Sequence, residues 1–427
     1  MRQRAGGKRR ATVAVLASVI ALILTGCTPY ANAGTKLPDQ VAGSFSADVK
    51  GRLDAAVTDA MTQSGSSAAM VGVWAPWAGS WVAGKGTTAV KGGTKVTPDM
   101  SFRIAENTMP MTCTVLLGLV DDGTVKLDDQ VLKYLPGFVG VDGVTLRELC
   151  QNTSGLGDYG PILNRIFVNN PTRQWPALEL ASDGIAAPAV GKPGEKFGLA
   201  ATNYILLGMA LENASGSSWQ ELYKKYIFSR LGMSSTYLPA SSDLTLTGAH
   251  PVGYATAIDA SGHAICGTVT DVSALSPSMG WTAFGAVSTV SDLKSFSQAL
   301  ATGSLLSKQS AKAQVDGISV GAAWREYGLG VSMLGPMRGS VGAIPGYLSA
   351  AFSDPVSGLT VVVALNNSSS GEVFIQSLAQ RLISIAAKAP AKQKGAKVVA
   401  GLPWSEEQAV AELKRSTVCA PAAAPAK

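Results

Sequence analysis

Histidine is nearly absent from this chain of 427 residues, which contains only His250 and His263. Both lie in a stretch rich in Gly, Ser and Thr, and no cluster of cysteines accompanies them. Protein metal sites are usually built from several Cys, His or acidic ligands at short spacing. We therefore expect no metal site and no other cofactor.

A concentrated positive charge is also missing. The formal net charge is +6, but five of the 35 Lys and Arg residues and none of the 29 Asp and Glu residues precede residue 27. The rest of the chain is nearly neutral and has no basic patch interleaved with aromatic residues, which nucleic-acid-binding surfaces favour. Nucleic acid is therefore excluded as an expected partner.

Long apolar runs are confined to the N-terminus. Basic residues within positions 2–10 precede an apolar run at 11–24, which is the layout of a secretory signal and is short for a membrane span. The tetrad LTGC, which ends at Cys27, resembles a bacterial lipobox, whose Cys is diacylated and becomes the mature N-terminus. We expect a signal peptide at 1–26 and a lipidated polar tether at 27–45, anchored to the outer face of the bacterial cell membrane. An ordinary secretory cleavage beside a chance Cys is the alternative.

Four cysteines remain after such a cleavage, in a compartment where disulfides form. Cys113 falls in the first turns of a helix expected from about residue 106, and Cys150 falls in the last turn of another. These two are candidates for a disulfide that would tie the helices together. Cys266 and Cys419 either pair with each other or stay unpaired.

The spacing of apolar residues predicts an α+β fold. Strand-like segments occur at 68–88 and, as three consecutive strands, between 327 and 368, whereas helical patterns dominate from 127 to 240. We expect an antiparallel sheet built from both chain ends, flanked by helices, with an all-helical middle region. This domain would span 46–388, and a C-terminal tail with one short helix would span 389–427.

Several segments, in this order, resemble the serine β-lactamases and D-alanyl-D-alanine carboxypeptidases, the penicillin-recognising hydrolases. They include TPDMSFRIAENT, VTLRELCQNTSGLGDY, GKPGEKFGLAATNYILLGMALE and VGAIPGYLSAAFSD, and the resemblance runs from about 47 to 388. It implies the fold of that family. It also implies a cleft with a Ser nucleophile and a Lys three residues later on one helix, a Tyr and an Asn from a loop, and a basic residue two positions before a Gly on a strand.

This chain departs from that pattern at each catalytic position. Glu106 follows FRIA where the Ser is expected, and Met109 stands where the Lys is expected. Apolar side chains replace the Tyr and the Asn, and a Ser replaces the basic residue of the strand. The degenerate positions, together with the Gly that the strand motif retains, are Glu106, Met109, Leu199, Ala201, Ser340 and Gly342.

The substitutions affect the cleft, whereas turn glycines and strand patterns persist, so we expect a stable fold around an altered site. Glu106 would lie at a helix N-terminus, which favours the charged carboxylate and makes it a poor proton donor. Asp158 and Tyr159 are its nearest partners by motif order and have a second interpretation as helix-capping or cleft-wall residues. Tyr347 is a further candidate for the cleft wall.

We therefore predict no catalytic residues. The expected function is that of a pseudoenzyme, a cell-envelope lipoprotein that binds a peptide, a cell-wall fragment such as a peptidoglycan peptide, or an envelope protein. The alternative is a divergent hydrolase of the same family that acts on a small ester, amide or peptide.

Overall fold

The computed structural model describes residues 34–258, 264–399 and 401–419. The predicted signal peptide and Cys27 lie outside these residues. Within the described part of the chain, no helix combines the length and the apolar character that a membrane crossing requires.

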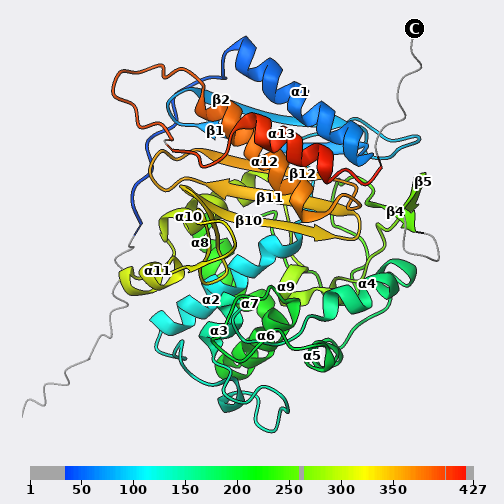
Figure 1. Ribbon diagram of the computed structural model, residues 1–427, viewed down its shortest axis with the longest axis vertical. Coiled ribbons are helices and arrows are strands. Elements are labelled where there is room, and N and C mark those ends of the chain that lie inside the picture. The colour runs from blue at the N-terminus through cyan, green and yellow to red at the C-terminus, as the bar shows by residue number, and fades with distance from the viewer. Residues whose placement is uncertain (1–33, 259–263, 400, 420–427) are drawn as a thin grey trace, which may run out of the picture. The chain divides into compact units, whose positions relative to one another are not determined.

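An antiparallel eight-stranded sheet forms the centre of the domain (Figure 1). The N-terminal strand β1 lies between β2 and the C-terminal strand β12, with Val71 opposite Val363. The sheet therefore joins the two chain ends, as the sequence predicts. In spatial order its strands are β2 (Gly79–Gly86), β1 (Ala68–Ala75), β12 (Thr360–Leu365), β11 (Tyr347–Ser353), β10 (Met337–Ile344), β9 (Ser332–Leu334), β8 (Arg325–Tyr327) and β7 (Ile318–Ser319).

Residues 339–354, expected as one strand, belong to the hairpin of β10 and β11. The chain reverses at Pro345 and Gly346, and Gly346 has a φ of 98°, in the left-handed region that glycine tolerates best. Because the side chains of β10 alternate in direction, this hairpin fixes which of them face the helices.

One face of the sheet is covered by α1 (Ala47–Ser64) and α12 (Gly371–Ala387), coloured blue and orange in Figure 1. Helix α1 begins where the Ser46 hydroxyl accepts a hydrogen bond from Val49 N–H, and it ends at the left-handed Gly65. Their buried apolar side chains form one core with that face of the sheet. The tail helix α13 (Glu406–Arg415) packs on α12.

The opposite face packs against the helical half of the domain, led by α2 (Thr108–Asp121) and α10 (Val290–Thr302). The other helices of this half are α3 (Leu146–Gln151), α4 (Tyr159–Asn169), α5 (Ala177–Ala186), α6 (Ala201–Ser215), α7 (Trp219–Tyr223), α8 (Ser229–Leu231), α9 (Trp281–Phe284) and α11 (Lys308–Gln314).

The middle of the chain is mainly, but not entirely, helical. The hairpin of β4 (Tyr254–Ile258) and β5 (Ala264–Asp271) occupies part of the stretch that showed no periodicity, and β3 (Phe102–Arg103) pairs with β6 (Val287–Ser288). Otherwise the α+β class with a large antiparallel sheet is confirmed.

Two disulfides cross-link the described chain. Cys113 of α2 is joined to Cys150 of α3, and Cys266 of β5 is joined to Cys419. The second disulfide attaches the end of the C-terminal tail to the β4–β5 hairpin.

Candidate functional site

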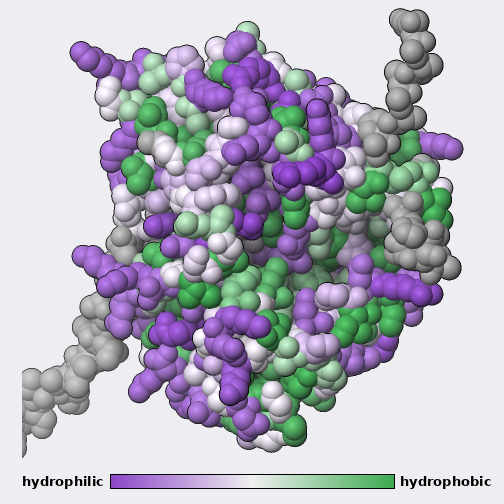
Figure 2. All heavy atoms as spheres, in the orientation of Figure 1, coloured by the Kyte–Doolittle hydropathy of each residue, from purple (hydrophilic) through white to green (hydrophobic). Residues whose placement is uncertain are grey.

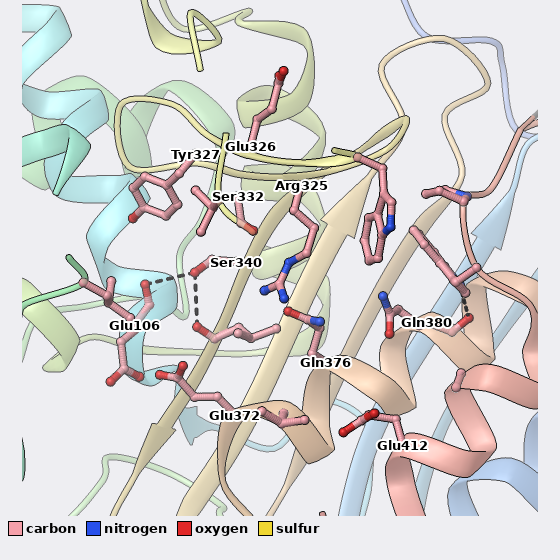
Figure 3. A pocket seen from close by; sticks show the side chains of 18 of the residues that line it. Glu106, Arg325, Glu326, Tyr327, Ser332, Ser340, Glu372, Gln376, Gln380 and Glu412 are labelled. Atoms are coloured by element: carbon pink, nitrogen blue, oxygen red, sulfur yellow. Dashed lines mark hydrogen bonds between the residues drawn. The ribbon is translucent and has the colours of Figure 1, made fainter. Parts of the chain in front are cut away.

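A cavity of about 640 Å³ opens between the sheet, the N-terminal end of α2, and helices α12 and α13. The space-filling view shows a hollow near the middle of the face drawn in Figure 1 (Figure 2). We call the part around Glu106, Met109, Leu199, Ser340 and Glu372 the near end. We call the part around Arg325, Gln376, Gln380, Trp404 and Glu412 the far end (Figure 3).

The short 3₁₀ helix Ala105–Asn107 positions Glu106 at the near end. Ala105 has a φ of 49°, an uncommon left-handed conformation for a residue other than glycine, and it turns the chain from β3 into this helix. The Asn107 side chain then donates to Ser349 Oγ, which in turn donates to the Ile104 carbonyl. The turn that presents Glu106 is therefore held on both sides by buried hydrogen bonds.

The Glu106 carboxylate folds back onto strand β10. Its Oε2 atom accepts a hydrogen bond from Ala343 N–H at 2.8 Å. The strand comes so close that a Cβ atom on Gly342 would lie 2.5 Å from Glu106 N and 2.7 Å from Oε2. Gly342 is thus required for this close approach, and the carboxylate occupies the space in front of the strand backbone.

Three carboxyl groups act on one another at the near end. The pKa of Glu106 is raised well above its ordinary value, chiefly by burial and next by the negative charge of Glu372, although Ala343 N–H opposes the shift. Burial, reinforced by Asp158, raises the pKa of Glu372 to about 7. Figure 3 shows the carboxylates of Glu106 and Glu372 facing each other.

These shifts correct the expectation that the helix N-terminus keeps Glu106 charged. Burial and a neighbouring carboxylate both disfavour the ionised form, and here they outweigh the backbone hydrogen bonds, including the one from Ala343 N–H. Burial therefore disfavours the charged form of Glu106, and Glu372, whose pKa is about 7, is protonated in part at neutral pH.

Asp158 lies in a second, smaller cavity of about 230 Å³ that shares Glu106, Met109, Leu199 and Glu372 with the first. Its Oδ1 atom accepts hydrogen bonds from the N–H groups of Gly160 and Ala201, both at 3.0 Å. Asp158 thus caps α4 and fixes the start of α6, while burial raises its pKa. Both interpretations of this residue, as a cap and as part of the cleft wall, apply.

The remaining predicted positions fall partly around the cavities and partly in the core. Met109 is 2% exposed and contributes to the cavity wall, Leu199 is 41% exposed, and Ser340 donates to the Glu106 carbonyl at 3.3 Å. Ala201 lines only the smaller cavity.

Tyr159 and Tyr347 do not line either cavity, contrary to their place among the cleft candidates. Both are buried, and their hydroxyls donate to the carbonyls of Met279 and Pro251 respectively. Apolar rings of this size contribute most when fully packed, so these residues serve the core.

The sequence analysis missed the residues that α12 contributes. Glu372, Gln376 and Gln380 recur every four residues along α12 and line one side of the larger cavity. Residues at this spacing share one helix face. The spacing of these three polar residues could therefore have indicated a helix face that is exposed to solvent or lines a site.

The far end is closed by the C-terminal tail. Trp404 is buried and donates from Nε1 to the Gln380 carbonyl at 3.2 Å and to Ser384 Oγ at 3.1 Å. This anchor places α13, with Gln408 and Glu412, along the cavity. The short helix that the sequence predicts in the C-terminal tail is therefore α13, and it forms part of the cavity wall.

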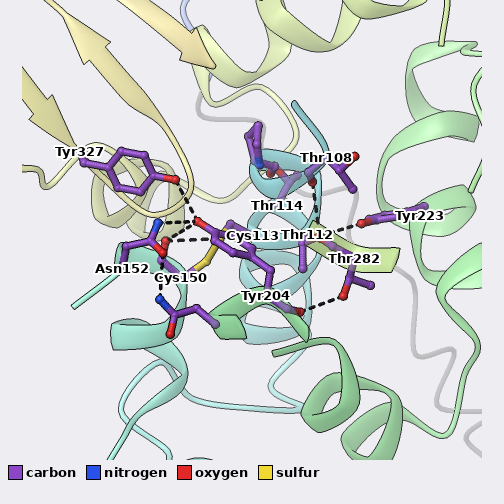
Figure 4. Close-up of a disulfide and its surroundings, with 12 residues drawn as sticks. Thr108, Thr112, Cys113, Thr114, Cys150, Asn152, Tyr204, Tyr223, Thr282 and Tyr327 are labelled. Carbon is purple, nitrogen blue, oxygen red and sulfur yellow. Dashed lines mark hydrogen bonds between the residues drawn. A yellow bond between two sulfur atoms is a disulfide. The ribbon is translucent and has the colours of Figure 1, made fainter. Parts of the chain in front are cut away.

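A buried polar network supports the cavity wall beside the Cys113–Cys150 disulfide (Figure 4). The Tyr204 hydroxyl donates to the Cys150 carbonyl and lies 2.9 Å from the hydroxyl of Tyr327, which lines the cavity. Asn152 donates to the same Tyr204 oxygen at 3.2 Å. The wall next to Leu199 is therefore rigidly tied to α3 and α6.

No group of three or more His, Cys, Asp or Glu side chains in the described ranges is arranged to hold a metal ion.

Comparison with known proteins covers most of the domain. A sequence model of the β-lactamase family matches residues 53–383. Penicillin-binding protein 4* of Bacillus subtilis (strain 168) is 31% identical over 140 residues, which are 32% of this chain and 30% of that protein. The D-alanyl-D-alanine-carboxypeptidase/endopeptidase AmpH of Escherichia coli (strain K12) is 33% identical over 159 residues, 35% of this chain and 40% of that protein. The matched segments thus span less than half the length of these curated relatives.

Solved structures agree on the architecture. A D-stereospecific amidohydrolase from Streptomyces sp. superimposes with a TM-score of 0.65 at 26% identity, covering 75% of this chain and 94% of that one. The D-amino acid amidase of Ochrobactrum anthropi SV3 shares the fold, with a TM-score of 0.68 at 23% identity and coverage of 79% and 98%. The fold is that of the β-lactamase and penicillin-binding-protein-like proteins. The chain belongs to the β-lactamase family.

Proposed function

We propose that this chain is a non-catalytic member of the β-lactamase family that binds a ligand in the cleft where its relatives carry out hydrolysis. The observation that carries the proposal is the Glu106 carboxylate, which accepts a hydrogen bond from Ala343 N–H at 2.8 Å. A carboxylate in this place fills the space that a substrate carbonyl would need, and it offers no hydroxyl for attack.

The expected loss of turnover without a serine nucleophile supports this proposal. Losing the nucleophile of a serine hydrolase costs on the order of 10⁶ in turnover, and the residual binding groups supply only about 10³–10⁴ over water. Those groups include backbone N–H donors aimed at the developing oxyanion. Here Glu106 Oε2 already accepts from one such donor, Ala343 N–H, so a negatively charged intermediate would meet a competing carboxyl oxygen.

The ligand that we propose is a short peptide, such as a fragment of peptidoglycan. A cavity of about 640 Å³ falls within the ordinary range for binding small molecules. The name of the relative from Escherichia coli describes a D-alanyl-D-alanine-carboxypeptidase/endopeptidase, which makes peptides the first ligands to test. An envelope protein that presents such a segment is the other occupant considered.

Titration calorimetry tests binding, with peptidoglycan stem peptides added to the purified chain that lacks residues 1–26 and carries Cys27→Ser. Mass spectrometry of the same mixtures tests turnover. We expect saturable binding with no loss of peptide over hours. Peptide hydrolysis by the purified chain, abolished in Glu106→Gln, contradicts the proposal.

One observation favours hydrolysis as the second candidate function. Glu106 and Glu372 form a pair of partly buried carboxyl groups, and the pKa of Glu372 is raised to about 7, close to the value that a general acid or base needs at neutral pH. In this case Glu106→Gln and Glu372→Gln should each abolish turnover, whereas Asp158→Asn should retain it in part. Equal, trace turnover in the wild type and all three variants argues against the pair.

We further propose that the protein is a lipoprotein on the outer face of the bacterial cell membrane, anchored through Cys27. The support is the basic flank, the apolar run and the LTGC tetrad of the sequence. Labelled palmitate should enter the membrane-bound protein, and Cys27→Ser should abolish the label. Palmitate incorporation that persists in Cys27→Ser contradicts this anchor.

A further inference from the structure

Arg325 brings a cation into the larger cavity, although no sequence motif predicts one there. It opens strand β8, and its side chain points into the cavity toward Gln376 in Figure 3. Its guanidinium lies 6.0 Å from the ring centroid of Trp324 and makes no ion pair or side-chain hydrogen bond with the described residues. Its five donors are therefore available to a ligand, and their planar geometry suits a carboxylate.

Two amide side chains of α12 accompany Arg325. Gln380 is only 7% exposed, lines the cavity, and its side-chain amide has no hydrogen-bond partner among the described residues. Gln376 stands one turn earlier on the same helix face, and its amide is likewise unpartnered within the described chain. Both amides are therefore open to the cavity, where a ligand could use them as hydrogen-bond donors and acceptors.

The other charges of the cavity leave Arg325 available. Arg415 is already paired with Glu412, whereas the shifted carboxyl groups of the near end owe their pKa changes to burial and to one another. The far end therefore holds one free cation flanked by two neutral amides. This set complements a single carboxylate followed by peptide N–H and C=O groups.

We infer that Arg325, Gln376 and Gln380 form a carboxylate-binding site, which takes the free C-terminal carboxylate of a short peptide. It is built from β8 and α12, and the wall beside it is α13, which lies beyond the family match at residues 53–383. The strand position that Ser340 occupies supplies no cation. The anionic end of the ligand is therefore bound by Arg325 on β8, two strands away from Ser340 in the same sheet, and by α12.

This inference rests on the proposed binding function, and its test separates the two. The probe is N-acetyl-D-alanyl-D-alanine, titrated calorimetrically as the free acid and as the C-terminal amide. A charged, bidentate contact predicts that the acid binds the wild type on the order of 10-fold or more tighter than the amide. In Arg325→Gln the ratio of the two affinities should fall to about 1, and in Arg325→Lys it should be intermediate.

Arg415→Gln is the matched control, because it removes a cavity-lining cation that already has a partner. Its acid-to-amide ratio should equal that of the wild type. Gln376→Leu should weaken acid binding less than Arg325→Gln does. It provides a second test if thermal unfolding shows that the Arg325 variants fold poorly.

Equal binding of acid and amide by the wild type overturns the carboxylate site and leaves the binding function standing. An unchanged ratio in Arg325→Gln overturns the role of that residue. Failure of both acid and amide to bind overturns the peptide-binding function together with this site.

Discussion

The two ends of the cavity differ in how their polar groups are satisfied. At the near end, Glu106 bonds to Ala343 N–H, Asp158 bonds to two further backbone N–H groups, and Glu372 is protonated in part at neutral pH. At the far end, the side chains of Arg325 and Gln380 have no hydrogen-bond or ion-pair partner among the described residues. The polar groups of the near end are thus satisfied by bonds within the protein, whereas those of the far end remain available to a ligand.

The far end depends on Trp404, so its loss should have the largest effect on stability. Trp404→Ala removes a buried ring and two hydrogen bonds from Nε1, and should lower the free energy of unfolding by about 3 kcal/mol. Chemical denaturation measures this change. Trp404→Phe, which keeps most of the packing, should cost about 1 kcal/mol. Equal, negligible costs for both variants would mean that α13 does not form the far wall.

Gly342→Ala tests how closely Glu106 and strand β10 pack at the near end. The added Cβ would lie 2.5 Å from Glu106 N, a distance that the backbone must relieve, so unfolding should become easier by about 1–3 kcal/mol. Gly51→Ala is the control, because no atom lies within 4 Å of its Cβ in helix α1, and it should be neutral or slightly stabilising. A neutral Gly342→Ala would contradict the close approach of Glu106 and β10.

The raised pKa of Glu372 gives the near end a distinct pH dependence. A carboxyl whose pKa rises to about 7 on folding binds more protons in the folded state, so its contribution to stability falls as pH increases from 5 to 8. Glu106 and Asp158 face this carboxyl and act in the same direction. Glu372→Gln should therefore reduce the loss of unfolding free energy over this range by about 1–2 kcal/mol, since the group is partly exposed.

Denaturant unfolding at pH 5 and pH 8 measures the slope for the wild type and the variant. Glu412→Gln is the far-end control, and it should leave the slope unchanged because Glu412 is not among the charges that raise the pKa of Glu106 or Glu372. Parallel slopes for the wild type and Glu372→Gln would rule out the coupled carboxyl groups.

The smallest effect is expected for Glu106→Ser. It removes one hydrogen bond to Ala343 N–H but also a carboxyl that burial penalises, so the change in unfolding free energy should stay below about 1 kcal/mol. Met109→Lys should destabilise the protein more than Glu106→Ser, because Met109 is 2% exposed and a buried ammonium needs a partner. A large loss of stability in Glu106→Ser alone would show that Glu106 serves mainly as structure.

The periodic spacing of apolar residues and the helix-capping residues made the helices and the sheet predictable. The residues that line the cavity follow no such spacing. Helix α1 follows its Ser46 cap and Gly65 stop, and the strands near both chain ends pair as their apolar residues indicate. The ends of individual strands were harder to predict, because the chain reversal at Pro345 and Gly346 depends on one tight turn.

The site was predictable only where motif order places a residue. Glu106 and Met109 follow FRIA directly and lie at the cavity, whereas Tyr159 and Tyr347 proved to be core residues. Arg325 and Trp404 come from a short strand and from the tail, and only folding brings them to the same cavity. Likewise, the protonation of Glu106 depends on Glu372, which lies 266 positions further along the chain and acts through burial and proximity.

The central claim is that the near end cannot perform acyl transfer. Intact-mass spectrometry of the purified chain after incubation with a fluorescent penicillin tests it most directly, because an acyl-enzyme adds the mass of the whole antibiotic to one side chain. The account predicts an unchanged protein mass after prolonged incubation. A stoichiometric adduct that Glu106→Gln or Ser340→Ala abolishes would contradict it.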